Sequence, residues 1–131
     1  MLDGLKAGWL VKQGHRRLNW LRRYCIISPS NLLVYFDSED CLKLKGHIVL
    51  PNYYLAMDEG HLNFTLHKPK AVSSNIGGHD VFHFELVEDE GDLSEERHAE
   101  LKVVLFAWRD ALMMCGCRLK PFESPGGKWF G

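Results

Sequence analysis

The chain has 131 residues, of which 46% are hydrophobic and 25% are charged, and its formal net charge is -1. This length and composition are typical of one compact domain with a sizeable core. No apolar run approaches the ~20 residues that a membrane-spanning helix needs. A net charge near zero also argues against a general nucleic-acid binder, which would more often be basic overall.

The N-terminal part, residues 8–27, is expected to form two strands joined by a loop. Successive strand residues face opposite sides of a sheet. Leu10 and Lys12 therefore share one face of the first strand, and Leu21 and Arg23 share one face of the second. The alternation places a basic side chain of each strand beside apolar neighbours.

The third strand is expected at residues 31–37, where Leu33 and Tyr35 share a face. If the apolar members of these strands line a core, then Lys12, Arg23 and Tyr35 lie where that core opens to water. Arginine can hold a phosphate through two parallel hydrogen bonds, lysine offers a compact charge, and a tyrosine hydroxyl can donate one more hydrogen bond. Two cations and a phenol at the mouth of a small barrel therefore form a candidate phosphate receptor.

Further short strands, rich in apolar, β-branched or aromatic residues, are expected at residues 44–50, 53–57, 62–67 and 81–87. Turn-forming residues separate them. Seven short strands at this spacing predict a barrel or a sandwich.

From residue 93 to residue 117 the hydrophobic period becomes helical. The apolar stripe consists of Leu101, Val104, Leu105, Trp108, Leu112 and Cys115. Asp92 and Glu95 resemble a capping box, with Ser94 as an alternative cap, and Gly116 is the expected stop. A long amphipathic helix after a barrel would close one open end, which predicts that Trp108 lies in the core.

The order and spacing of several short motifs resemble the pleckstrin homology (PH) domain family. The first strand pair carries Gly-Trp-Leu-x-Lys at 8–12 and Trp-x-Arg-Arg-Tyr at 20–24. The pattern continues through residues 33–36, 45–46 and 48–51 and ends with the helical Trp108.

This resemblance covers residues 5–117 and implies a mainly β fold. The fold would be a seven-stranded, partly open barrel or sandwich capped by one C-terminal amphipathic helix. It would occupy residues 1–117, and the Pro and Gly spacing of residues 118–131 is typical of an irregular tail.

In PH domains that bind phosphoinositides, the matching positions hold lysine or arginine, with a tyrosine in the same place. The resemblance therefore assigns Lys12, Arg23, Tyr35 and Lys45 to headgroup contact. The family usually places a further basic residue where this chain has Leu21. Loss of one charged hydrogen bond costs about 1.5–3 kcal/mol. The pattern thus favours a simpler anionic lipid, such as phosphatidic acid or a singly phosphorylated phosphoinositide.

The loop between the first two strands offers a second contact with a membrane. In this loop His15, Arg16 and Arg17 precede Leu18. Basic residues beside apolar ones can be attracted to an anionic surface and then insert shallowly, and each cation contributes about 1 kcal/mol near it. Trp20, next to this loop, either joins the contact or packs on the strand pair.

Several other classes of site are not predicted. The four cysteines, Cys25, Cys41, Cys115 and Cys117, form no CxxC pair, which is typical of a reduced cytosolic protein and argues against a zinc site. The seven histidines form no HExxH pattern, and neither a GxSxG motif nor a glycine-rich nucleotide loop is present. We therefore expect no metal, no cofactor and no catalysed reaction.

Two functions fit these residues. The first is a cytoplasmic, peripheral membrane-targeting module that binds an anionic phospholipid headgroup through the basic barrel mouth. The second is an adaptor module that binds a protein partner, with weak or no lipid binding, since one fold can host many tasks. Leu21 favours the adaptor, whereas Lys12, Arg23, Tyr35 and Lys45 favour the lipid. A peptide binder would use a strand edge or a helix groove and would be indifferent to loss of charge at the mouth.

Overall fold

The computed structural model describes residues 5–13, 19–69, 81–87 and 94–120, together with the backbone of residues 122–123 and 129–130. Its first strands are β1 (Lys6–Gln13), β2 (Trp20–Ser28), β3 (Leu32–Phe36), β4 (Leu44–Val49), β5 (Tyr54–Asp58), β6 (Asn63–His67) and β7 (Val81–Leu86). A short 3₁₀ turn, η1 (Leu50–Asn52), follows β4, and the helix is α1 (Glu95–Met114). Three two-residue strands complete the chain: β8 (Arg118–Leu119), β9 (Phe122–Glu123) and β10 (Trp129–Phe130). The predicted mainly β fold with one C-terminal helix is confirmed.

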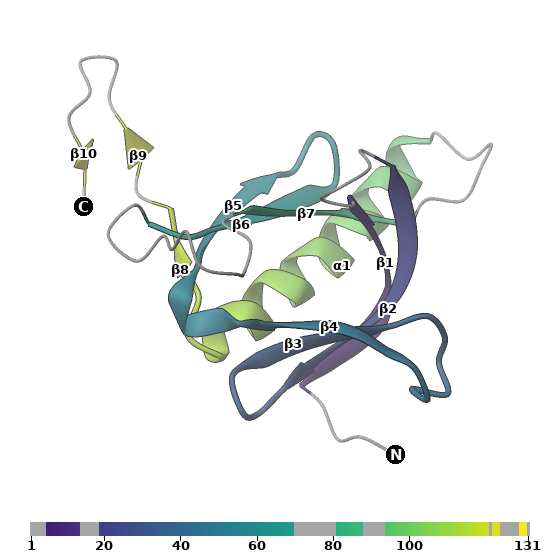
Figure 1. The fold of residues 1–131 in the computed structure, drawn as a ribbon. Coiled ribbons are helices and arrows are strands. Elements are labelled where there is room, and N and C mark those ends of the chain that lie inside the picture. The colour runs from purple at the N-terminus through teal and green to yellow at the C-terminus, as the bar shows by residue number, and fades with distance from the viewer. Residues whose placement is uncertain are drawn as a thin grey trace.

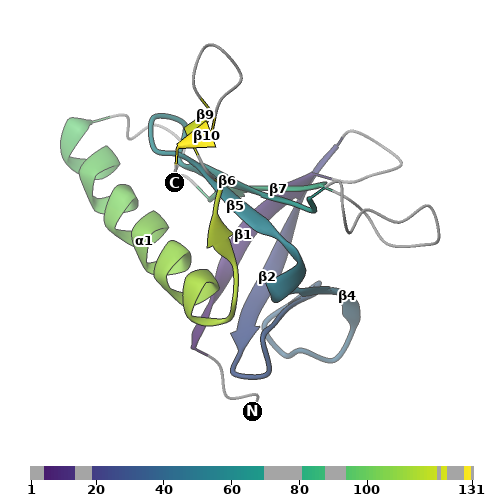
Figure 2. The ribbon, with the colours of Figure 1, turned by 90° about the vertical axis from the view of Figure 1, so that its left-hand side faces the viewer.

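Strands β1 to β8 form one open sheet in the order β4-β3-β2-β1-β7-β6-β5-β8. Neighbouring strands are antiparallel, except that β5 and β8 are parallel. Figures 1 and 2 show the sheet folded into two layers, with β2–β4 in one and β5–β7 in the other, and with α1 packed across one open side. The helix therefore closes one end of the barrel, and the opposite end is left to the loops.

The helix begins and ends through local interactions. Ser94, the alternative cap, accepts a hydrogen bond at its Oγ from the backbone N–H of Arg97 at 3.1 Å. The other candidate, Asp92, lies outside the described residues. The helix stops before Gly116, as expected, and Gly116 has a φ of 101°, which glycine adopts without strain.

The buried face of α1 contains most of the predicted stripe. Leu105 and Leu112 are 0% exposed, and Trp108 is 1% exposed, so the prediction that Trp108 lies in the core is confirmed. Val104 was expected on this face but is 38% exposed. Val104 lies at the edge of the apolar stripe, where a side chain is only partly covered. Ala111, which was not part of the predicted stripe, is buried. Among the described residues, no helix is long and apolar enough to cross a membrane.

The start of the C-terminal tail differs from the expectation of an irregular segment. β8 pairs in parallel with β5, and the N–H of Lys120 donates to the carbonyl of Leu55 at 2.8 Å. The edge of a sheet presents unpaired backbone groups, and the chain leaving α1 passes along that edge and satisfies some of them.

Candidate functional site

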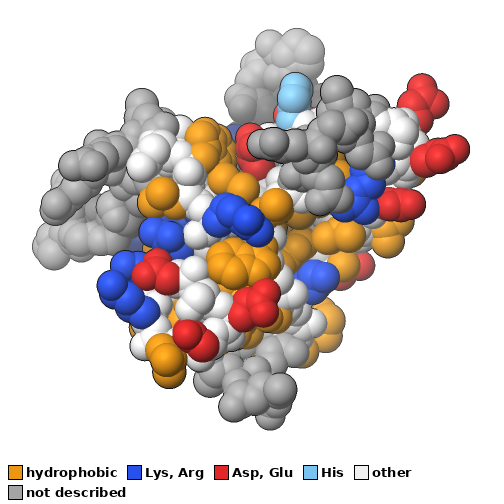
Figure 3. Space-filling view, turned by 90° about the vertical axis from the view of Figure 1, so that its right-hand side faces the viewer, with side chains coloured by type: hydrophobic (Ala, Val, Ile, Leu, Met, Phe, Trp, Pro, Cys, Tyr) orange, Lys and Arg blue, Asp and Glu red, His pale blue; other side chains and the backbone are white. Residues whose placement is uncertain are grey.

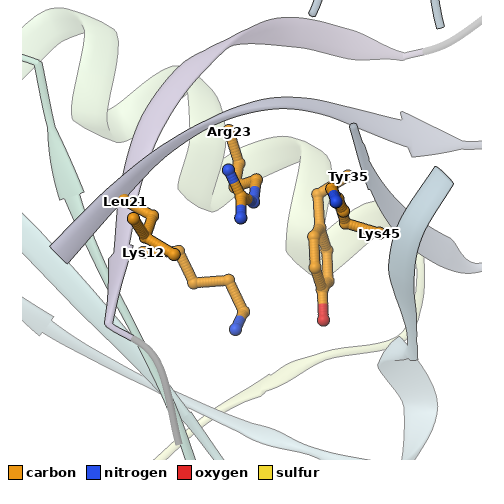
Figure 4. A pocket seen from close by; sticks show the side chains of 5 residues that line it. All are labelled: Lys12, Leu21, Arg23, Tyr35 and Lys45. Atoms are coloured by element: carbon orange, nitrogen blue, oxygen red, sulfur yellow. The ribbon is translucent and has the colours of Figure 1, made fainter. Parts of the chain in front are cut away.

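The register of three strands brings the predicted site residues to one face of the sheet. Lys12 on β1 is opposite Leu21 on β2, and Tyr35 on β3 is opposite Gly46 on β4. Together Lys12, Leu21, Arg23, Tyr35 and Lys45 line a pocket of about 190 Å³. Figure 4 shows the Lys12 ammonium and the Arg23 guanidinium directed into the same space, with the Tyr35 ring across from them. All four residues assigned by resemblance therefore line one pocket, although whether they bind a ligand stays a prediction.

Lys12 is an unusual member of this pocket, because it is a charged side chain that is only 8% exposed. Its Nζ lies 4.9 Å from the centre of the Tyr35 ring and 5.4 Å from that of Phe82. No carboxylate among the described residues pairs with it. Burial lowers the pKa of Lys12, and the nearby charge of Arg23 lowers it further. A bound anion would supply the missing partner for this ammonium group.

A carboxylate that sequence reasoning missed, Asp37, joins the other two cations. Its Oδ1 lies 3.4 Å from Arg23 Nη1, and its Oδ2 lies 3.3 Å from Lys45 Nζ. Alternation beyond the end of β3 could have found it, since Asp37 follows Tyr35 by two residues and so shares its face. Asp37 partly neutralises the pocket and competes with any anion for both cations.

An irregularity in strand pairing places Lys45. Tyr35 pairs with Gly46 and Phe36 pairs with Leu44, so Lys45 has no partner across β3. An extra residue of this kind is a β-bulge, which redirects side chains and often lies beside binding sites. The bulge directs Lys45 toward the pocket.

Tyr35 is held over a glycine. A Cβ atom at Gly46 would overlap the hydroxyl and the ring of Tyr35. Gly46 was part of the motif resemblance, but its role in seating Tyr35 was not predicted. Burial raises the pKa of the Tyr35 hydroxyl, so at neutral pH this group remains protonated and can donate a hydrogen bond to an anion.

The membrane-contact loop predicted at His15, Arg16, Arg17 and Leu18 lies outside the described residues. Trp20, next to it, is 43% exposed. Leu21, which lines the pocket where the family usually has a basic residue, is 39% exposed.

The opposite face of the β1–β2 pair is occupied by a separate cluster, as alternation requires. Arg22 lies over the Trp9 ring at 5.1 Å, and Trp9 Nε1 donates to Glu39 Oε1 at 2.7 Å. The ring of Tyr24 packs edge-on against that of Trp9. On the side of the molecule where β1 and β2 lie, hydrophobic, basic and acidic side chains are accordingly interspersed (Figure 3). Arg22 therefore does not replace the cation missing at Leu21.

A second, larger hollow of about 390 Å³ shares Tyr35 as a wall with the first. It is lined by Tyr35, Gly46, His47, Ile48, Val49, Asn52, Tyr53, Lys68 and Phe82. Lys68 is its one lysine among the described residues, and Lys68 Nζ lies 5.6 Å from the centre of the Tyr53 ring. This hollow was not predicted from the sequence.

Comparison with curated proteins finds relatives that are similar over a short stretch. Switch-associated protein 70 of Gallus gallus is 44% identical over 50 residues, which make up 38% of this chain and 8% of that protein. The Mus musculus protein "Differentially expressed in FDCP 6" is 48% identical over 48 residues, or 37% of this chain and 8% of that protein. The matched stretch is thus a small part of the length of either relative.

Solved structures share the fold at low sequence identity. The PH domain of the human pleckstrin homology domain-containing protein family A member 5 has a TM-score of 0.58 and 19% identity, covering 93% of this chain and 84% of that one. The PH domain of Slm1 has a TM-score of 0.62 and 15% identity, covering 88% and 97%. The C-terminal PH domain of pleckstrin has a TM-score of 0.58 and 20% identity, covering 88% and 98%.

The family comparison extends well beyond the short stretch shared with the curated relatives. The PH domain model matches residues 4–106, which include every strand that lines the pocket and the first part of α1. Because this match spans most of the chain, the protein belongs to the PH domain family.

Proposed function

We propose that this domain binds the phosphate of an anionic phospholipid headgroup in the pocket of Lys12, Leu21, Arg23, Tyr35 and Lys45. Binding would attach it peripherally to the cytoplasmic face of a membrane. The observation that carries the proposal is the largely buried Lys12 side chain, whose ammonium group has no carboxylate partner among the described residues and shares the pocket with Arg23 and Lys45.

The chemistry of the pocket fits a phosphate group. Lys12 would contribute a compact ammonium charge, Arg23 a planar guanidinium, and Tyr35 a hydroxyl donor. Lys45 would close the site from β4. The proposed role is binding alone, and no step in it breaks or forms a covalent bond.

Two structural neighbours support this class of ligand. The Slm1 PH domain was solved in complex with D-myo-inositol-4-phosphate, and the C-terminal PH domain of pleckstrin with D-myo-Ins(1,2,3,5,6)P5. At 15% and 20% identity these neighbours share the fold with this chain. The pocket of this chain is therefore the main support for a phosphate ligand, and the neighbours show that the fold can hold inositol phosphates.

The net positive charge of the pocket is small, which favours a ligand with few phosphate groups. Asp37 offsets part of the charge of Arg23 and Lys45, and Leu21 offers no donor. A headgroup with one phosphate, as in phosphatidic acid or a singly phosphorylated phosphoinositide, matches this arrangement better than a polyphosphorylated one.

Co-sedimentation with phosphatidylcholine vesicles, each containing one anionic lipid, tests the proposal. The variant Lys12→Ala/Arg23→Ala removes two charges from the pocket, and Lys102→Ala/Arg118→Ala removes two charges from α1 and β8 as a control. We expect the first variant to lose binding to a preferred lipid and the control to keep it. Equal loss in both variants, or binding to every anionic lipid alike, would show charge attraction without a specific site.

The adaptor function is the second candidate, and the Asp37 ion pairs favour it. A pocket whose Arg23 and Lys45 are already paired with Asp37 needs no ligand to satisfy those two cations. If the wild-type domain binds none of the lipids, the pocket is structural, and a protein partner becomes the conclusion.

A further inference from the structure

The side chain of Lys12 has a property that headgroup binding does not use, because its nitrogen can also act as a nucleophile. A neutral amine forms an imine with an aldehyde, and lysines do so most readily when they are desolvated or lie beside another cation. We infer that Lys12 is a site of covalent modification by phosphorylated aldehydes, which form an imine at its Nζ while Arg23 and Lys45 hold their phosphate. This inference rests on the proposed phosphate pocket and adds a reaction that would close that pocket to other ligands.

The surroundings of Lys12 shift it toward the neutral amine. Its side chain is only 8% exposed, and burial together with repulsion from the Arg23 guanidinium lowers its pKa. The nearby Cys25 would oppose this only as a thiolate, and burial raises the pKa of its thiol to about 12. The rings of Tyr35 and Phe82 favour the ammonium form, so the proton is lost less easily than burial alone would allow. The net effect is that more of Lys12 is neutral at a given pH than of an ordinary exposed lysine.

No carboxylate among the described residues holds the proton on Lys12. Asp37, the carboxylate beside the pocket, pairs instead with Arg23 Nη1 at 3.4 Å and with Lys45 Nζ at 3.3 Å. An ion pair with Lys12 would favour its charged form and raise its pKa. The pairing of Asp37 thus separates two roles, because Arg23 and Lys45 supply charge for a phosphate and Lys12 is left as the nucleophile.

The geometry of the pocket selects an aldehyde that carries its phosphate close to its carbonyl group. Lys12, Arg23 and Lys45 line one pocket of about 190 Å³. Figure 4 shows the Lys12 nitrogen extending into this space and the Arg23 guanidinium turned toward it. A phosphate held by Arg23 would place a neighbouring aldehyde within reach of Lys12 Nζ, which raises the effective concentration of the aldehyde there. Pyridoxal 5′-phosphate is a suitable probe, because its aldehyde and its phosphate-bearing group are attached to neighbouring ring carbons.

The reaction consumes only the amine and the aldehyde. The Lys12 ammonium first gives one proton to water, and the lone pair on Nζ then attacks the carbonyl carbon. The C=O bond breaks, its oxygen leaves as water with the two remaining protons of the nitrogen, and a C=N bond forms. Borohydride then adds hydride to the imine carbon, which converts the imine to a stable secondary amine and fixes the label for mapping.

Labelling with pyridoxal 5′-phosphate, trapping with borohydride and peptide mass spectrometry test the inference. The exposed lysines Lys43 and Lys120 are internal comparisons in the same chain. Pyridoxal, which lacks the phosphate, tests whether the phosphate guides the aldehyde. Arg23→Ala removes the guanidinium of the pocket, and Arg118→Ala removes an exposed guanidinium from β8 as the matched control. Thermal unfolding verifies that each variant folds.

We expect Lys12 to be labelled faster than Lys43 and Lys120, and an excess of inositol 4-phosphate to slow its labelling. Loss of the phosphate from the probe and the change Arg23→Ala should each lower the labelling of Lys12 about tenfold, because each removes a charged hydrogen bond. Arg118→Ala should leave it unchanged. Equal labelling of the three lysines, or equal labelling of Lys12 by pyridoxal, would overturn the inference.

Calorimetry with soluble inositol 4-phosphate separates this inference from the proposed function. If the wild type binds inositol 4-phosphate but Lys12 is not labelled selectively, the inference is overturned and the headgroup pocket stands. If Lys12 is labelled selectively but inositol 4-phosphate neither binds nor protects it, the reactive amine stands and the proposed headgroup binding is overturned.

Discussion

The most direct test of the pocket is to restore the basic residue that the family usually has at position 21. The substitution Leu21→Lys does this and leaves no cavity in the core, because Leu21 is not buried. Leu21 lies opposite Lys12 in the β1–β2 register, lines the pocket and is 39% exposed. A lysine can therefore extend toward bound phosphate while its stem keeps part of the leucine's packing.

The expected gain follows from one added charged hydrogen bond. Such a bond contributes about 1.5–3 kcal/mol, which corresponds to about tenfold to a hundredfold tighter binding. In the empty pocket, the new lysine is repelled by Lys12 and Arg23, which should lower the free energy of unfolding. The size of this effect should be about 1 kcal/mol or less, because exposed charges attract one another by no more than that when their signs are opposite. The gain should be larger for inositol bisphosphates and trisphosphates than for the monophosphate, because a second phosphate can then meet the new cation.

Calorimetry with soluble inositol phosphates at two salt concentrations measures this gain. The control is Leu44→Lys, which adds the same charge near the same end of the sheet, at a residue that does not line the pocket. An equal gain in both variants, vanishing at higher salt, would mean attraction at long range. No gain from Leu21→Lys would refute the assignment of this pocket to phosphate.

Three further changes probe the parts of the site separately. Gly46→Ala should displace Tyr35, which lowers the free energy of unfolding by about 1–3 kcal/mol and weakens headgroup binding in calorimetry. The control is Gly60→Ala, where a new Cβ atom meets nothing closer than 3.6 Å. Equal effects of the two changes would contradict the steric role of Gly46. Asp37→Asn removes the ion pairs with Arg23 and Lys45. Because exposed ion pairs contribute about 0.2–1 kcal/mol, the affinity for inositol 4-phosphate, measured by calorimetry, should rise about two- to fivefold. A weaker affinity would instead mean that the Asp37 carboxylate orients the two cations. Because burial lowers the pKa of Lys12 in the folded state, the unfolded chain binds more protons between the lowered and the ordinary value. The free energy of unfolding should therefore rise as pH increases through that window while anion affinity falls, and Lys12→Met should remove both pH dependences in unfolding and binding titrations.

Much of the fold could be predicted because it depends on local periodicity. Alternation located the seven strands before the helix and placed Lys12, Arg23 and Tyr35 on one face, while the helical period placed Trp108 in the core. Each of these features is a property of residues a few positions apart, since the period of a strand or helix fixes where neighbouring side chains point. The same alternation explains why Arg22 lies on the opposite face, over the Trp9 ring.

The energetics of the site were decided by contacts between distant segments. The carboxylate of Asp37 pairs with cations from β2 and β4, the bulge opposite β3 admits Lys45, and Gly46 leaves space for Tyr35. None of these contacts has a local sequence period, because each depends on the register between strands and on side chains that meet across it. The same holds for β8, which forms only because the chain leaving α1 meets the free edge of β5.

The sequence by itself therefore determined which residues face the mouth of the barrel, because strand alternation is a short-range rule. Only the tertiary structure decided how much charge that mouth retains. Packing beside two rings leaves the Lys12 side chain only 8% exposed, and Asp37 offsets its neighbours. Both effects arise from the dielectric environment and the distances that packing creates, and these exist only once the strands have paired.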